Sequence, residues 1–175
     1  MSDFRSTRLW QETLAARHND PHEAPRERLR NALEKFRERA SILAGEIPQD
    51  LRDLTVHDIT HLDALWETAD VVSGDDLPFT PTEGFVLGGA FLLHDLGMSI
   101  AAFPGGLSEL RQRPEWNDRM IGAIRRVLGR DPGPEDLVAP PPEAVEDVKF
   151  SLLRSLHAEQ AEQLASNPWK DPWQQ

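Results

Sequence analysis

The feature that most constrains this chain is an adjacent histidine and aspartate, His94-Asp95, inside an otherwise apolar segment, residues 88–97. An ionised carboxylate without a partner in a buried helix costs several kcal/mol, so Asp95 must be protonated, meet a cation or bind a metal. If residues 83–99 form one helix, both polar side chains point into packed structure. Taken alone, the pair is also compatible with a structural role, with His94 a satisfied core histidine and Asp95 a local hydrogen-bond acceptor.

A second histidine segment lies upstream, where His57 and His61 are four positions apart. They share a helix face if the helix reaches back to His57. Thr55 or Asp58 could cap this helix, and a start at Asp58 leaves His57 outside it. A histidine on one amphipathic helix and a His-Asp pair on a second, buried helix is a common way for helical hydrolases to assemble a divalent metal site. His57 could then be a ligand, a substrate contact or a donor that fixes a carboxylate.

These residues carry a family resemblance. His61, followed by Leu62-Asp63, and His94-Asp95, followed by Leu96-Gly97, resemble the pattern of the HD superfamily of metal-dependent phosphohydrolases. That pattern is a histidine on one helix, a His-Asp doublet on a later helix and a distal aspartate. The segment 154–159, which contains His157, is similar to the one that supplies an additional metal histidine in larger HD subgroups.

A narrower likeness is to HD modules fused to chaperone-type ATPases in bacterial conflict systems. It rests on Leu54-Thr55 and His57 upstream of His61, and on Gly97-Met98 after the doublet.

The resemblance implies a phosphohydrolase that acts on a phosphomonoester, a phosphodiester or a nucleotide. His61, His94 and Asp95 would hold one divalent ion, and Asp95 could bridge to a second ion held partly by His157. The metal would activate a water for attack on the phosphate, with His57 or Arg154 stabilising the transferred group. Catalytic candidates are therefore Asp95, His57 and Arg154. Manganese, iron, magnesium and zinc all suit these ligands.

The distal aspartate of the family has no clear counterpart. Downstream of His157 the chain offers only Asp171, and Asp147 precedes His157, which is out of family order. Either the chain is truncated before the helix that carries this aspartate, or another residue completes the site, or catalysis has been lost. The alternative function is thus an inactive or incomplete HD-like module that senses a nucleotide or binds a partner domain of a larger protein. A purely structural bundle, the third possibility, would require an arginine or lysine beside Asp95.

The amino-acid composition limits which classes of molecule this chain is expected to bind. Thirty acidic and 19 basic residues give a net charge of -11, which disfavours nucleic acid or an anionic membrane as the main partner. A phosphorylated small molecule or nucleotide stays possible because a metal can supply the positive field. The chain has no cysteine, so metal ligands must come from His, Asp or Glu. No apolar run approaches about 18 residues and the N-terminus lacks signal-peptide form, so we expect a cytoplasmic protein.

The apolar spacing predicts an all-α fold, an HD-domain-like helical bundle. We expect an N-terminal helical segment over residues 1–22, an HD-like domain over 23–166 with a stiff, extended, proline-rich linker or insertion near 130–142, and a Pro/Trp tail over 167–175 that could bind a partner.

Local patterns add four expectations. Gly84, Gly88 and Gly89 predict close approach by a neighbouring helix. The charged residues from Arg26 to Glu38 predict a solvated face, and the arginines of residues 111–126 are interpreted as surface residues in preference to a phosphate site. An apolar stripe that ends at Val72 is expected to face the core.

Overall fold

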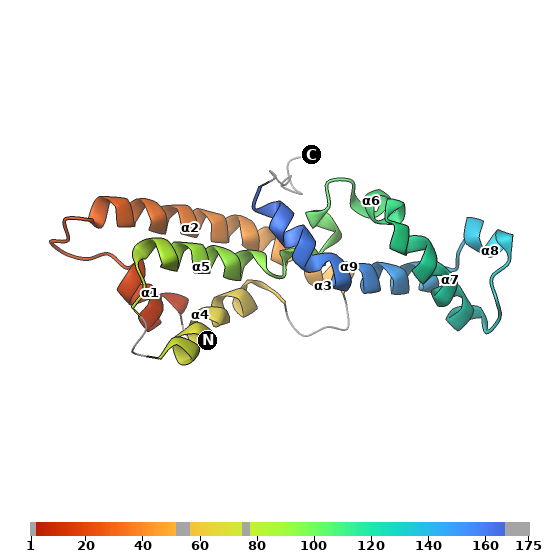
Figure 1. The fold of residues 1–175 in the computed structure, drawn as a ribbon, viewed down its shortest axis with the longest axis horizontal. Helices are drawn as coiled ribbons and strands as arrows, with labels where there is room; N and C mark the ends of the chain where they lie inside the picture. Colours follow the sequence, from red (N-terminus) through yellow and green to blue (C-terminus); the bar gives the residue numbers. More distant parts are fainter. Residues whose placement is uncertain (1–2, 52–56, 75–77, 167–175) are drawn as a thin grey trace.

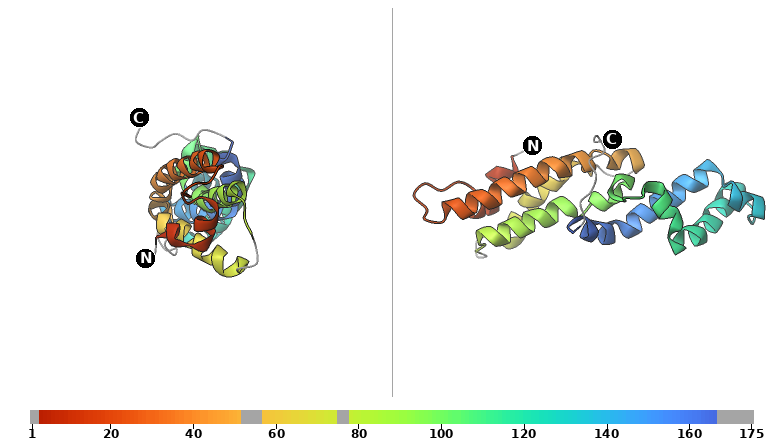
Figure 2. Two further views of the ribbon diagram at one scale, coloured as in Figure 1. Left: turned by 90° about the vertical axis from the view of Figure 1, so that its left-hand side faces the viewer. Right: turned by 90° about the horizontal axis from the view of Figure 1, so that it is seen from above.

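The computed structural model describes residues 3–51, 57–74 and 78–166, and every regular element in these ranges is a helix. The predicted all-α fold is confirmed. The molecule is elongated, with α1, α2, α4 and α5 at one end, α6, α7 and α8 at the other, and α9 running from the far end to the middle (Figures 1 and 2). The elements are η1 (Phe4–Ser6), α1 (Arg8–Thr13), α2 (Glu23–Ala44), α3 (Ile47–Asp50), α4 (Ile59–Ser73), α5 (Pro81–Leu93), η2 (Leu96–Met98), η3 (Ile100–Ala102), α6 (Gly106–Gln112), α7 (Pro114–Leu128), α8 (Pro134–Val138) and α9 (Pro142–Leu164).

Two glycines let α5 pack closely against its neighbours. A Cβ at Gly84 would lie 2.5 Å from the side chain of Thr13 in α1, and a Cβ at Gly88 would lie 2.5 Å from the ring of Trp66 in α4. The predicted close approach is therefore confirmed at these two positions. It is wrong at Gly89, where the nearest atom would be 3.9 Å away.

Helix α5 begins with a capping box. Thr80 caps the helix, its hydroxyl accepting from the backbone N–H of Glu83 while the Glu83 carboxylate accepts from the Thr80 backbone N–H. This reciprocal pair satisfies two backbone donors that a helix start leaves open. Pro81 follows at the first helical position, where its missing N–H costs nothing.

The end of α5 differs from the expectation. The single helix considered over residues 83–99 is not formed, because α5 stops at Leu93 and the tighter 3-10 turn η2 follows. The N–H of Met98 donates to the carbonyl of Asp95 at 2.9 Å and closes this turn. The turn brings the Gly97 backbone so close to α9 that a Cβ there would lie 2.2 Å from the carbonyl oxygen of His157. Tertiary contact with α9 thus outweighs the local helical pattern.

Three further local expectations need correction. Arg26, predicted on a solvated face, is only 5% exposed, because its guanidinium donates to the carbonyl of Thr13 at 2.7 Å and pairs with Asp20. Val72, predicted to face the core, is 81% exposed. The proline-rich segment 130–142 is not uniformly extended, since it contains the short helix α8.

Two arginines of the region 111–126 form ion pairs with acidic side chains of α9. Arg126, in the last turn of α7, pairs with Asp147 of α9. Arg113, which precedes α7, pairs with Glu159, closer to the C-terminal end of α9. Among the described helices, none combines the length and the apolar character needed to cross a membrane.

Candidate metal centre

Three histidines converge on one carboxylate oxygen. Oδ2 of Asp95 lies 3.0 Å from Nδ1 of His57, 3.3 Å from Nε2 of His61 and 2.9 Å from Nε2 of His94. The rings also face one another, with centroids 5.2 Å apart for His57 and His61 and 5.6 Å apart for His61 and His94. The three residues that the sequence assigned to one ion are therefore together, and His57 joins them.

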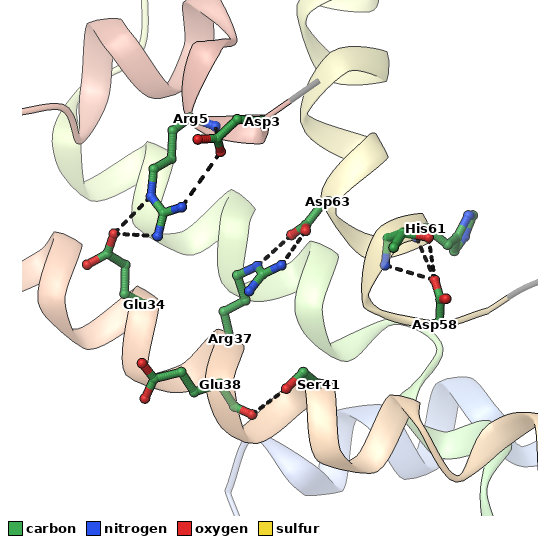
Figure 3. Close-up of polar contacts among 10 residues, drawn as sticks. Asp3, Arg5, Glu34, Arg37, Glu38, Ser41, Asp58, His61 and Asp63 are labelled. Atoms are coloured by element: carbon green, nitrogen blue, oxygen red, sulfur yellow. Dashed lines mark hydrogen bonds and ion pairs between the residues drawn. The ribbon is translucent and has the colours of Figure 1, made fainter. Parts of the chain in front are cut away.

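The start of α4 places the first two histidines. Asp58 caps this helix, its carboxylate accepting from the backbone N–H of Thr60 at 2.8 Å and from that of His61 at 3.3 Å (Figure 3). Helix α4 thus begins at Ile59, and of the two predicted caps Asp58 is the one described. His57 lies just before the helix and His61 in its first turn, so both side chains reach the same carboxylate without sharing a helical face.

The end of α5 orients the third histidine. Nδ1 of His94 lies 2.9 Å from the carbonyl oxygen of Phe91, in the last turn of α5. A carbonyl only accepts, so Nδ1 carries the proton and, in the neutral ring, Nε2 keeps its lone pair. Such a backbone bond fixes the tautomer that a metal-binding histidine requires. The sequence reasoning missed Phe91 as a partner, although a histidine three positions after a helical carbonyl at a helix end signals this bond.

Burial and the neighbouring histidines shift the pKa of Asp95 in opposite directions, and this residue is only 4% exposed. Burial, the largest single influence, raises the pKa of Asp95, but the hydrogen bonds and charges of His94 and His57 outweigh it and hold that pKa below its ordinary value. Burial likewise lowers the pKa of His94, while its bonds to Asp95 and Phe91 and the charge of Asp95 bring the net pKa above the ordinary value.

The side-chain partners of Asp95 are histidines. In the described ranges no arginine or lysine forms an ion pair with this carboxylate. The purely structural bundle, which required such a basic partner, is therefore not what these residues show. Histidine rings can release a proton near neutral pH and bind a metal instead, whereas arginine cannot.

The donor set fits a divalent ion. One ligand atom each from His57, His61 and Asp95 lie within 4.8 Å of one another, and Nε2 of His94 approaches the same carboxylate oxygen. Imidazole nitrogens with a carboxylate oxygen suit zinc, iron, manganese and other divalent metals. Side chains of His61 and His94 are 36% and 39% exposed, so the site opens to solvent on their side.

The predicted residues on α9 lie outside this group. Nδ1 of His157 donates to the carbonyl of Arg154 at 2.6 Å, and the His157 backbone contacts Gly97. The guanidinium of Arg154 lies 5.7 Å above the ring of Phe150. No described contact joins either side chain to Asp95, so the metal role of His157 and the catalytic role of Arg154 stay predictions.

The distal aspartate is not found in this group. Of the two residues considered for it, Asp147 pairs with Arg126, 2.5 Å away, and Asp171 lies outside the described residues. Leu54-Thr55, part of the narrower likeness to modules of bacterial conflict systems, also lies outside them.

Comparison with known proteins gives one match. A family model described as HD-CE matches residues 51–175, a range that contains His57, His61, His94 and Asp95. No curated protein and no solved structure matches the chain.

Proposed function

The chain belongs to the HD-CE family, and from this premise we propose that it is a metal-dependent phosphohydrolase that acts on a phosphomonoester, a phosphodiester or a nucleotide. The observation that supports the proposal is the convergence of three imidazoles on Oδ2 of Asp95. The family match supports an HD-type domain, and the ligand group supports a divalent metal. The reaction, the substrate, the bacterial origin and the cytoplasmic location stay predictions.

His57, His61 and Asp95 would hold the ion, with His94 beside them. A bound divalent metal would supply a Lewis acid that makes a water nucleophilic near neutral pH and offsets negative charge on a phosphate. This positive charge matters in a chain whose net charge is -11, because the protein surface alone would repel an anionic substrate.

The chain's own groups would orient the reaction. Burial of Asp95 excludes water from the carboxylate, and the bond from His94 to the carbonyl of Phe91 fixes its ring. His57 is proposed either as a ligand or as a donor to a phosphoryl oxygen, since its Nδ1 lies 3.0 Å from the carboxylate. Arg154 is kept as a candidate donor from α9, where its side chain is exposed.

The test compares matched histidine variants. Metal content of the purified protein is measured by elemental analysis, and turnover is measured on a panel of phosphoesters with manganese, iron, magnesium or zinc added. We expect His61→Ala to lose metal and turnover together. His18→Ala, which removes an exposed histidine on the loop before α2, should keep both. A wild-type protein that takes up none of these metals would overturn the proposal.

One observation favours an alternative function. The described ligand group contains a single carboxylate, Asp95, whereas the family pattern includes a distal aspartate. An inactive HD-like module that binds metal or nucleotide and transmits its state to a partner domain would need no second carboxylate. Metal uptake and nucleotide binding without turnover of any phosphoester would favour this module over the enzyme.

A further inference from the structure

Asp95 is not held by a helix. Helix α5 ends at Leu93, and Asp95 lies in the short connection before η2, with its carbonyl accepting from the N–H of Met98. The position of the carboxylate therefore depends on what holds the η2 turn and the residues that follow it. Contacts from two other helices do so.

The first contact is with α9. The Gly97 backbone lies against the backbone of His157, where a Cβ would approach the carbonyl oxygen to 2.2 Å. This close packing prevents the turn from moving toward α9. It does not prevent movement in the opposite direction, because a van der Waals contact resists compression far more than separation.

The second contact is with Asp50, the last residue of α3. Oδ2 of Asp50 accepts from the hydroxyl of Ser99 at 3.0 Å and from the backbone N–H of Ile100 at 2.8 Å. Ser99 is fully buried, and its hydroxyl oxygen also accepts from the N–H of Ala101 at 3.1 Å. Asp50 thus satisfies two donors that the chain presents directly after η2, and it fixes the turn by directional bonds.

A lysine from α9 compensates the charge of Asp50. Nζ of Lys149 lies 3.8 Å from Oδ1 of Asp50 and 2.6 Å from a carboxylate oxygen of Glu146. Lys149 is 9% exposed, and the side chain of Asp50 is 17% exposed. A largely buried carboxylate with a cation and two hydrogen-bond donors is a costly arrangement to keep unless its geometry is specific.

We infer that Asp50 is a positioning residue for the metal centre: by binding Ser99 and Ile100 it holds the η2 turn so that the Asp95 carboxylate meets the three histidines. The inference rests on the proposed metal-binding function. Partners that orient metal ligands typically change metal affinity by about 10- to 100-fold when they are removed. Asp50 acts one step further out, through the backbone that carries the ligand.

The experiment uses Co²⁺ as the metal probe, because its visible absorption spectrum reports ligand geometry. Wild-type protein is compared with Asp50→Asn and with Asp20→Asn. Asp20 is a matched control: its side chain is 15% exposed and paired with Arg26, and it lies on the loop between α1 and α2. Ser99→Ala, which removes one of the two bonds to Asp50, is a milder variant that keeps the test valid if Asp50→Asn fails to fold.

We expect Asp50→Asn to weaken Co²⁺ binding by about tenfold or more and to shift the absorption bands, and Ser99→Ala to have a smaller effect in the same direction. Asp20→Asn should lower the unfolding temperature without changing affinity or spectrum. Wild-type affinity and spectrum in both Asp50→Asn and Ser99→Ala would overturn the positioning role.

Hydrogen exchange of the metal-free protein separates this inference from the proposed function. The amide of Met98 bonds to the carbonyl of Asp95, so its exchange rate reports the turn itself. We expect faster exchange at Met98 in Asp50→Asn and an unchanged rate in Asp20→Asn. If wild-type protein binds no Co²⁺, the proposed function fails, and unchanged exchange at Met98 in Asp50→Asn would still separately overturn the claim that Asp50 holds the turn.

Discussion

A Cβ at Gly97 would lie 2.2 Å from the carbonyl oxygen of His157, so the turn that follows the Asp95 carboxylate admits no side chain. The obstacle is backbone, in the interior of α9, and cannot rotate away as a side chain can. The η2 turn and helix α9, which are far apart in sequence, are thereby fixed at one point.

We therefore expect Gly97→Ala to destabilise the fold by about 1–3 kcal/mol and to weaken metal binding, because relief of the clash must move the η2 turn or α9. Gly89→Ala is the matched control. Its Cβ would meet nothing closer than 3.9 Å inside α5, so it should stabilise the protein by about 0.5–1 kcal/mol through the lower chain entropy of alanine. Urea unfolding of both variants measures this contrast. Equal stabilities for the two would contradict the close contact with His157.

The metal-free protein should lose stability as the pH rises above 6.5, the ordinary pKa of histidine. The pKa of His94 is raised from its ordinary value of 6.5, so its contribution is fully present below 6.5 and is lost as the pH rises through the raised value. The pKa of Asp95 is lowered from 3.8, so its contribution is present above 3.8 and is lost as the pH falls through the lowered value. The pair therefore stabilises the fold most between these two ordinary values.

Urea unfolding at a series of pH values from about 5 to about 9 measures how the free energy of unfolding changes with pH. We expect the free energy of unfolding of the wild-type protein to fall toward the alkaline end, and the fall to be smaller in His94→Gln. His18→Gln, at an exposed position, should follow the wild type. Metal affinity should instead increase as the pH rises, because metal and protons compete for the same imidazole nitrogens.

Arg26 links α2 to the end of α1. Its guanidinium donates to the carbonyl of Thr13 and pairs with Asp20, while Nε has no hydrogen-bond partner and lies 3.6 Å from a carboxylate oxygen of Glu23. We expect Arg26→Gln to cost about 2 kcal/mol, because it leaves the buried end of α1 without a charged donor. Arg28→Gln, two positions away and exposed, should change stability by less than about 0.5 kcal/mol. Thermal unfolding of the two variants measures this difference. Similar unfolding midpoints would contradict the stabilising role of Arg26 and agree with the solvated position that its sequence pattern predicted.

The sequence predicted those features that depend on residue type and local spacing. The all-α fold followed from apolar periodicity, and the grouping of His61, His94 and Asp95 followed from a motif whose members need one another chemically. The end of α5 at Leu93 could not be predicted in the same way, because the contact that favours the η2 turn comes from α9, more than fifty positions later.

Long-range partners also explain the errors at charged residues. Arg26 lies in a run of alternating charges that is typical of a solvent-exposed face, and the carbonyl of Thr13 and the carboxylate of Asp20 draw it inward. Asp50 gave no signal at all, since a lone aspartate at the end of a four-residue helix has no pattern until Ser99 and Lys149 are placed beside it.

Metal binding should stabilise the protein, and the size of the effect depends on Asp95. A ligand that binds only the folded state, present at about 100 times its dissociation constant, adds about 2.7 kcal/mol, or roughly 5–10 °C in the unfolding midpoint for a chain of this size. Asp95→Asn should abolish this rise, because a neutral amide oxygen binds a divalent ion far more weakly than a charged carboxylate does. Asp131→Asn is the control, since it removes an exposed carboxylate paired with Arg125 and should leave the rise intact. Because the chain carries a net charge of -11, its acidic surface also attracts divalent ions. If the unfolding midpoint of Asp95→Asn rises as much as that of the wild type, the stabilising ion binds this surface and not Asp95.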